Sequence, residues 1–120
     1  MKKTILSCCL ALLSCLAFAQ KDIQKKIQTQ FIMAEDGAVI DLPEGTFTLS
    51  STLSLDSKNN IVIRGKGTDK TILDFKGQTD GAEGLRVTNG KNIVVENLTV
   101  QNTKGDAVKT MNLNGITFRN

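Results

Sequence analysis

Asn92-Ile93-Val94-Val95-Glu96-Asn97 is the stretch that decides the fold, because the chain repeats its pattern. It returns as Gly115-Ile116-Thr117-Phe118-Arg119-Asn120, an offset of 23 residues. An earlier version, Asn60-Ile61-Val62-Ile63-Arg64-Gly65, stands 32 residues upstream. In each copy apolar residues alternate with other residues, and the copy ends on Asn or Gly. A unit that recurs at such a period indicates a stacked repeat architecture.

Short strands separated by turn residues surround these copies. We expect strands at residues 38–42, 46–50, 52–55, 61–64, 71–75, 85–88, 93–96, 98–101, 108–110 and 116–119. Nearly every gap between them contains Gly, Asn or Asp, which tolerate left-handed backbone conformations. Three short strands per repeat predict an all-β fold, a right-handed parallel β-helix (a solenoid), with its first coils in residues 37–120.

In a parallel β-helix each coil lies on the one before, so equivalent side chains form ladders. The expected inward ladders are Ile61–Ile93–Ile116 and Ile63–Val95–Phe118. Asn97 and Asn120 take equivalent places at a bend, where stacked amides can hydrogen-bond to one another, and Gly65 is their counterpart one coil earlier. The longer interval between the first two copies predicts a loop at residues 77–84 that protrudes from one corner.

A sandwich of two sheets is the alternative fold, since it too consists of many short strands and turns. The strands of a sandwich, however, have no reason to resemble one another at a fixed offset. The repeated copies therefore favour the solenoid.

Residues 20–36 precede the strands and are expected to contain a helix. Ile23, Ile27, Phe31 and Ala34 form one apolar stripe flanked by Lys and Gln. The first coil of a solenoid exposes both its apolar core and the edges of its strands. We therefore expect this helix to cap that end.

The first 19 residues predict a secretory signal peptide. A positive start is followed by an apolar run at residues 5–16, too short to span a membrane, and by the cleavage site Ala17-Phe18-Ala19. A competing interpretation is lipoprotein processing at Cys15, because the residues before it resemble a lipobox. The sequence thus predicts export to the periplasm, the cell surface or the medium, without a membrane span.

Cleavage after Ala19 changes the composition of the chain. All three cysteines lie in the leader, so the rest of the chain cannot form a disulfide. Lys2 and Lys3 are also removed, which leaves 13 of the 15 basic residues against 12 acidic ones. This near-neutral balance gives no electrostatic case for a nucleic-acid partner.

The opening coils resemble a known family. Residues 40–47, followed by 61–67 and 71–74, are similar to secreted bacterial parallel β-helix repeat proteins of the pectate-lyase-like group. The resemblance covers essentially the whole chain after the leader. It implies the N-terminal part of a protein that acts on or binds an acidic polysaccharide, because the group includes polysaccharide lyases, hydrolases and uronan epimerases as well as non-catalytic surface proteins.

Asp80, Glu83 and Asp106, with Asp74 nearby in sequence, are the candidates for a calcium site. Stacking of coils can bring them to one face, and Ca²⁺ takes several carboxylate oxygens. An ion bridging these groups and a uronate would acidify the α-proton of the sugar, which a basic side chain then removes. The candidate bases are Arg64, Arg86, Lys104 and Lys109. Ordinary turn chemistry and surface charge are the alternative reading of all these residues.

A second acidic group stands at the end of the helix, at Glu35, Asp36, Asp41 and Glu44. Its spacing does not match a calcium loop such as the EF-hand. We interpret it as a solvated junction between helix and strand.

No catalytic constellation is recognisable, since the chain has no His, Trp or Tyr. Two functions stay open for the protein to which these coils belong: an enzyme that acts on an acidic polysaccharide, or a non-catalytic surface solenoid that binds one. No cofactor is implied other than calcium. For this segment we expect an architectural role, starting the stack and sealing its end. We also expect the coils to continue past Asn120, because a final coil there leaves an apolar layer open.

Overall fold

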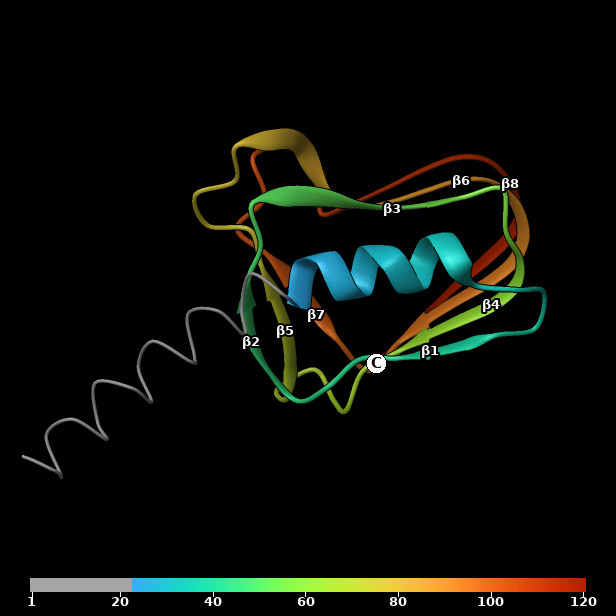
Figure 1. Ribbon diagram of the computed structural model, residues 1–120, viewed down its shortest axis with the longest axis horizontal. Coiled ribbons are helices and arrows are strands. Elements are labelled where there is room, and N and C mark those ends of the chain that lie inside the picture. Colours follow the sequence, from blue (N-terminus) through green and yellow to red (C-terminus); the bar gives the residue numbers. More distant parts are fainter. Residues whose placement is uncertain (1–22) are drawn as a thin grey trace, which may run out of the picture.

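The structure, a computed structural model, describes residues 23–120. The expected signal peptide, its cleavage after Ala19 and lipidation at Cys15 lie outside the described residues. The strands are β1 Val39–Asp41, β2 Gly45–Thr48, β3 Ser51–Asp56, β4 Asn59–Arg64, β5 Thr71–Asp74, β6 Asp80–Glu96, β7 Thr99–Gln101 and β8 Val108–Arg119. They form a parallel β-solenoid of about three turns, preceded by a helix at residues 23–33 (Figure 1). The predicted parallel β-helix is confirmed.

All strand pairs are parallel, and they form two sheets. The first contains β1, β4, β6 and β3 in that order, with β8 also paired to β6; the second contains β2, β5 and β7. Two pairs of strands expected to be separate are continuous, since residues 85–88 and 93–96 both belong to β6, and residues 108–110 and 116–119 both belong to β8. The ladder persists because Asn89 and Asn92, at φ of 55° and 54°, turn the chain while residues 90 and 91 stay paired with β8.

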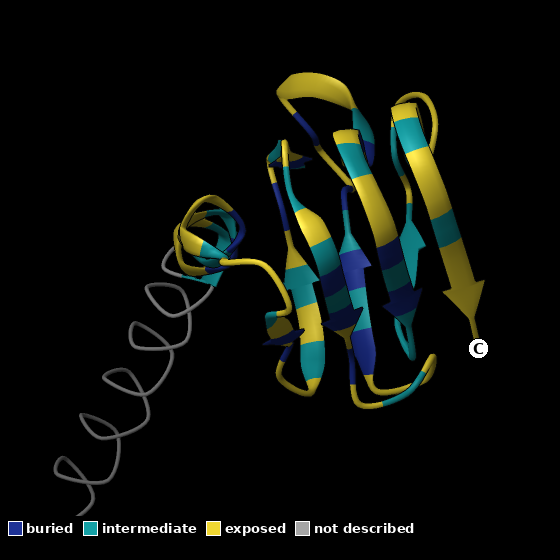
Figure 2. Cartoon of the chain, turned by 90° about the vertical axis from the view of Figure 1, so that its right-hand side faces the viewer, coloured by how far each residue is buried: buried dark blue, intermediate teal, exposed yellow. Residues whose placement is uncertain are grey.

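The register of the strands confirms the predicted inward ladders. Ile61 pairs with Ile93 and then Ile116, while Ile63 pairs with Val95 and then Phe118. Ile40 extends the second ladder by one coil, since it pairs with Ile63. The middle rungs are buried, with Ile63 at 1% exposure and Val95 at 5%. The buried rungs form part of the hydrophobic core, together with residues such as Leu55, Leu73 and Val87. Buried segments lie on the inner strands, whereas the last strand is mostly exposed (Figure 2).

Residues with a left-handed backbone conformation lie at the corners of the coil, where the sequence predicts turns. Asn97 and Asn120 have φ of 59° and 53°, which confirms the bend expected after that strand. The hydrogen bonds between stacked amides lie at other corners, however. Asn92 Nδ2 donates to Asn60 Oδ1 at 2.9 Å, and Asn112 Nδ2 donates to Asn89 Oδ1 at 2.8 Å.

Gly65 stands where the next two coils carry Asn97 and Asn120, and the packing explains why it is not Asn. Its N–H donates to the carbonyl oxygen of Glu96 at 3.0 Å, so its backbone lies directly on the next coil. A Cβ at this position would lie 2.1 Å from the carbonyl oxygen of Asn97. Backbone cannot move aside as a flexible side chain can, so this rung requires glycine.

The loop expected at residues 77–84 is a local excursion of β6. The pairing of β3 with β6 shifts between Ser51 and Leu53, because the partner strand accommodates extra residues there. The excursion projects from one corner (Figure 1). Gln78, which is only 1% exposed, holds it in place by hydrogen bonds to its backbone. Gln78 Nε2 donates to the carbonyl oxygens of Asp80 and Glu83 at 3.2 and 2.8 Å.

The helix lies across one end of the stack, opposite the end that carries β8 (Figure 2). Ile27 and Phe31, at 0% and 1% exposure, enter the hydrophobic core, and Ile23 and Ala34 pack against it. The helical period of the stripe therefore places its members on the face that meets the coil. In the described part of the chain no helix is long and apolar enough to cross a membrane.

Two glutamines of this helix bind the backbone of the first coil. Gln28 accepts a hydrogen bond from the Ser54 N–H and donates one to the Ser54 carbonyl, both at 2.9 Å. Gln24 likewise accepts from the Ser50 N–H at 2.9 Å and donates to the Ser51 carbonyl at 3.4 Å. A side-chain amide has the same donor and acceptor as a peptide group, so the glutamines occupy the free edge of β3 as another strand would.

Candidate functional site

A polar groove runs over the outer face of β3, β6 and β8 and around the adjoining corner. In-register rows of outward side chains, Ser54–Arg86 and Asp56–Thr88–Met111, form its floor. It consists of two adjoining hollows of about 480 and 500 Å³, which share Asn89 and Asn112. The groove therefore follows the stack, and each coil contributes equivalent positions to it.

A hydrogen-bonded ladder at the corner fixes the shape of this groove. Asn112 donates to Asn89, and Asn89 Nδ2 donates to Asp56 Oδ1 at 3.0 Å. Hydrogen bonds from Thr88, Asn89 and Ser57, in decreasing order of effect, hold the pKa of Asp56 below its usual value. The carboxylate is thus ionised at neutral pH, and its oxygens are already engaged.

The cations of the groove remain available to a ligand. Arg86 is exposed and lines the first hollow, and Lys91 lines the second. Lys109, the register partner of Arg86, does not line either hollow, and its Nζ lies 3.6 Å from Glu83 Oε1. Guanidinium and ammonium groups beside amide donors suit a ligand that carries both carboxylates and hydroxyls.

Sequence reasoning named Arg86 and Lys109 but missed Asn89, Lys91 and Asn112. The sequence indicates only a gap with turn residues at positions 89–92, between the strands expected at 85–88 and 93–96. The signal was present, because Asn112 follows Asn89 at the same 23-residue offset as the main repeat. Applying that offset to turn residues as well as strands would have found the ladder.

The structure places the calcium candidates on neighbouring segments of the projecting corner. Asp80 accepts a hydrogen bond from Ser51 Oγ at 3.5 Å, Glu83 faces Lys109, and the Asp106 carbonyl accepts from the Gly84 N–H at 3.1 Å. Within residues 23–120, no group of three or more Asp, Glu, His or Cys side chains is arranged to hold a metal ion. The calcium site stays a prediction.

Asp74, the fourth carboxylate, belongs to a different ladder. It accepts hydrogen bonds from Asn102 Nδ2 at 3.0 Å and from the Lys76 N–H at 2.9 Å. These bonds, with that of Asn102 contributing most, lower the pKa of Asp74.

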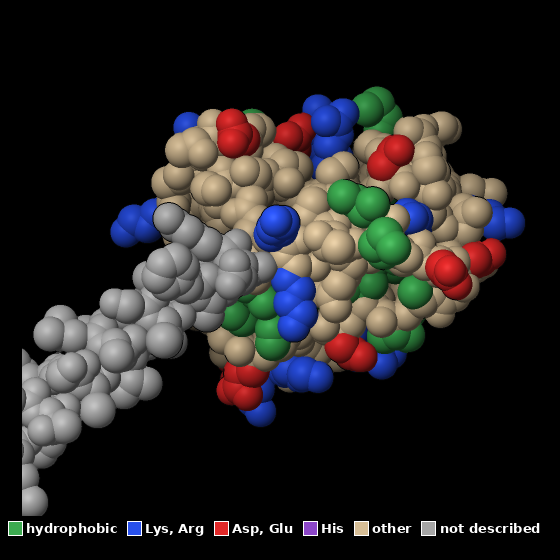
Figure 3. Space-filling model, in the orientation of Figure 1, with side chains coloured by type: hydrophobic (Ala, Val, Ile, Leu, Met, Phe, Trp, Pro, Cys, Tyr) green, Lys and Arg blue, Asp and Glu red, His purple; other side chains and the backbone are tan. Residues whose placement is uncertain are grey.

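The four residues of the second acidic group, Glu35, Asp36, Asp41 and Glu44, are exposed, as expected for a solvated junction. Acidic and basic side chains are interspersed over the face of the molecule that carries the helix (Figure 3).

Arg64, Glu96 and Arg119 form an ion-pair row on the face opposite the expected inward ladder. Arg64 Nε and Arg119 Nη2 each lie 3.0 Å from an oxygen of Glu96. The hydrogen bond from Arg64 is the largest cause of a lowered pKa at Glu96. The candidate base Arg64 is therefore paired with the carboxylate of Glu96. Lys104, another candidate base, is exposed, and its backbone N–H donates to Gln78 Oε1.

The low pKa of Glu96 predicts an acid-sensitive stack. Because folding lowers this pKa below its ordinary value of 4.5, the stabilisation is present above pH 4.5 and is lost as the pH falls through the lower folded value. We expect Glu96→Gln to reduce the loss of stability on acidification, measured as urea midpoints from roughly pH 7 to pH 3. Glu44→Gln, at an exposed position, is the control substitution. An unaltered profile in Glu96→Gln would contradict the assignment.

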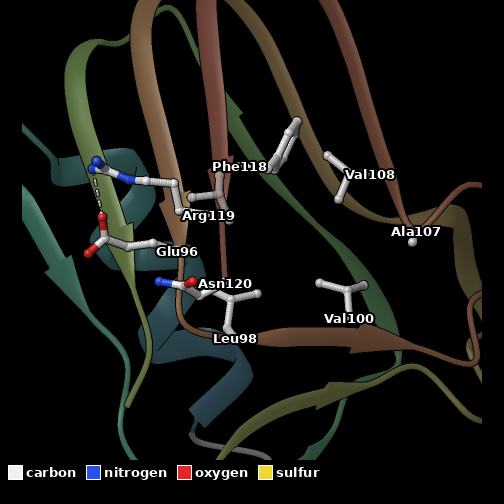
Figure 4. A pocket seen from close by; sticks show the side chains of 9 residues that line it. Glu96, Leu98, Val100, Ala107, Val108, Phe118, Arg119 and Asn120 are labelled. Carbon is white, nitrogen blue, oxygen red and sulfur yellow. Dashed lines mark hydrogen bonds and ion pairs between the residues drawn. The ribbon is translucent and has the colours of Figure 1, made fainter. Parts of the chain in front are cut away.

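The end of the stack away from the helix is apolar and open. A hollow of about 300 Å³ is lined there by Val95, Leu98, Val100, Val108 and Phe118, among others (Figure 4). Phe118 is 53% exposed, although Val95, one rung earlier in its ladder, is 5% exposed. The last described coil thus presents core positions to solvent.

Comparison with protein-family models, with curated protein sequences and with solved structures finds no match to this chain.

Proposed function

We propose that residues 23–33 cap the solenoid, and that the coils they cap begin an exported parallel β-helix protein that acts on or binds an acidic polysaccharide. The observation that carries the cap is the pairing of Gln28 with the backbone of Ser54 beside the buried Ile27 and Phe31. The helix thereby meets both needs of a solenoid end, an apolar cover and partners for a strand edge.

Gln28→Ala tests the polar part of this cap. It leaves the Ser54 N–H and carbonyl without their partners, and we expect it to cost about 1–3 kcal/mol of unfolding free energy. Hydrogen exchange at Ser54 is expected to accelerate with it. Gln30→Ala removes the same side chain from another side of the helix and should cost less than about 0.5 kcal/mol. Equal losses in urea unfolding for the two variants would argue against the cap.

The polysaccharide proposal is supported by the polar groove. Arg86 and Lys91 provide cations for uronate carboxylates, and the ladder of Asn89 and Asn112 presents amides for hydroxyls. Asn89 and Asn112 repeat an amide at the same corner of two successive coils, as a chain of acidic sugars repeats its groups along its length. This correspondence favours an extended anionic ligand over a small molecule.

Electrophoresis in gels that contain a polyuronate tests this proposal. We expect the protein to be retarded by the polyuronate and not by a neutral glucan, and Arg86→Ala with Lys91→Ala to weaken retention about tenfold. Lys25→Ala with Lys26→Ala, two exposed lysines of the helix, is the matched control for the loss of two charges. Equal mobility in both gels would refute the proposal. Absorbance of unsaturated products then separates a lyase from the second candidate, a non-catalytic binding solenoid.

We also propose that the coils continue past Asn120. The exposure of Phe118 supports this, since every earlier member of its ladder is buried by the coil that follows. Reading the coding frame beyond Asn120 tests it. Further repeats with alternating apolar residues are the expected result, and an immediate stop codon would overturn it.

A further inference from the structure

Charged side chains of alternating sign run along one face of the stack. Asp41, Arg64, Glu96 and Arg119 lie in register on β1, β4, β6 and β8. Neighbouring rungs of a sheet are about 4.8 Å apart, so side chains on adjacent rungs can touch. Both guanidinium groups do reach Glu96, one at each carboxylate oxygen. Each charge is therefore placed beside the opposite charge of the next coil.

Arg119 is the rung at which this alternation stops. Arg64 stands between the carboxylates of Asp41 and Glu96, whereas in the described part of the chain Arg119 has a carboxylate on one side only. Its side chain is 58% exposed. One of its nitrogens is bonded to Glu96, and the other donors of the guanidinium fork remain free for a second carboxylate. Arg119 also borders the apolar hollow at the open end (Figure 4).

We infer that this end is covered by a parallel strand that carries Asp or Glu opposite Arg119, and that the same chain supplies this strand as its next coil. The inference rests on the proposed continuation past Asn120. The register sets the rest of the pattern: apolar residues opposite Ile116 and Phe118, and Asn or Gly opposite Asn120. A basic residue opposite Arg119 would instead place like charges directly across the ladder.

A second copy of the chain fits this end less well. β8, the exposed edge strand, contains Lys109 and Arg119 but neither Asp nor Glu. Two copies that pair through β8 would therefore bring together four basic residues and no new carboxylate. Charge complementarity and the continuity of the existing ladders both favour a coil of different composition.

The experiment extends the chain by a second copy of its own last coil, residues 98–120. The 23-residue offset brings the copied arginine opposite Arg119. The copied arginine is kept or changed to Glu, and both extended proteins are also made with Arg119→Glu. We expect Glu in the new coil to raise the melting temperature by about 4 °C over Arg, and Arg119→Glu to reverse this preference. The unextended protein is tested for dimers by light scattering.

The outcomes separate this inference from the proposed continuation. A docked coil, with slowed hydrogen exchange in β8, that shows no preference between Glu and Arg would overturn the carboxylate alone. A coil that fails to protect β8 in any variant would overturn the continuation. A stable dimer of the unextended protein that buries Phe118 would assign this end to a second copy and overturn both.

Discussion

The double variant Ile27→Lys, Phe31→Lys is expected to abolish the soluble folded protein. Both side chains are buried in the core at the helix end of the stack. Truncating such residues to Ala alone costs about 2–5 kcal/mol each, and an unpaired buried ammonium adds more. Since a domain of this size has about 5–15 kcal/mol of stability in total, the variant should fail to fold and should aggregate. Soluble yield and circular dichroism measure the outcome.

Ile32→Lys supplies a matched control on the same helix. Ile32 is 62% exposed, so the same substitution there should change the unfolding free energy by less than about 0.5 kcal/mol. Met33→Lys, at a position 71% exposed, controls for Phe31 in the same way. If the double variant at 27 and 31 remained soluble and folded, the helix would not be an essential cover of the core.

Gly65→Ala is expected to cost about 3 kcal/mol or more, although it adds a single methyl group. The new Cβ would collide with the carbonyl oxygen of Asn97, at a place where two coils meet through their backbones. Relief of the collision requires the coils to separate, which also strains the hydrogen bond from Gly67 N to Asn97 O. Chemical denaturation measures the loss.

Gly77→Ala separates this packing effect from the general effect of losing a glycine. Gly77 has φ of 81°, but nothing lies within 4 Å of a Cβ built there. Only the strain of the left-handed backbone remains, about 1–2 kcal/mol. A Gly65→Ala protein as stable as Gly77→Ala would show that the coils are not in such close contact at Asn97.

The ladders were predictable from sequence because the alternation of Ile and Val reports directly which side chains face inward. The hydrogen bonds of Gln24 and Gln28 to the first coil were not predictable. Polar residues beside an apolar stripe usually face solvent, and nothing in the sequence shows that a strand edge lies within their reach. The continuity of β6 was also missed. Asn89 and Asn92 signal a turn, but whether a ladder survives a turn depends on the neighbouring coil, which composition does not reveal. The candidate groove could not be predicted from the sequence for the same reason, because its residues become neighbours only when the coils stack.

The registers have a consequence for how the chain folds. Partners on successive coils are about 23–33 residues apart along the sequence, from Arg119 with Glu96 to Asn89 with Asp56. Each ladder therefore closes a short loop onto a coil that is already in place, and no pairing waits for a distant segment. During synthesis, a chain whose N-terminus leaves the ribosome first can order its helix and first coil. Each later coil can then fold onto the coil before it, in sequence order.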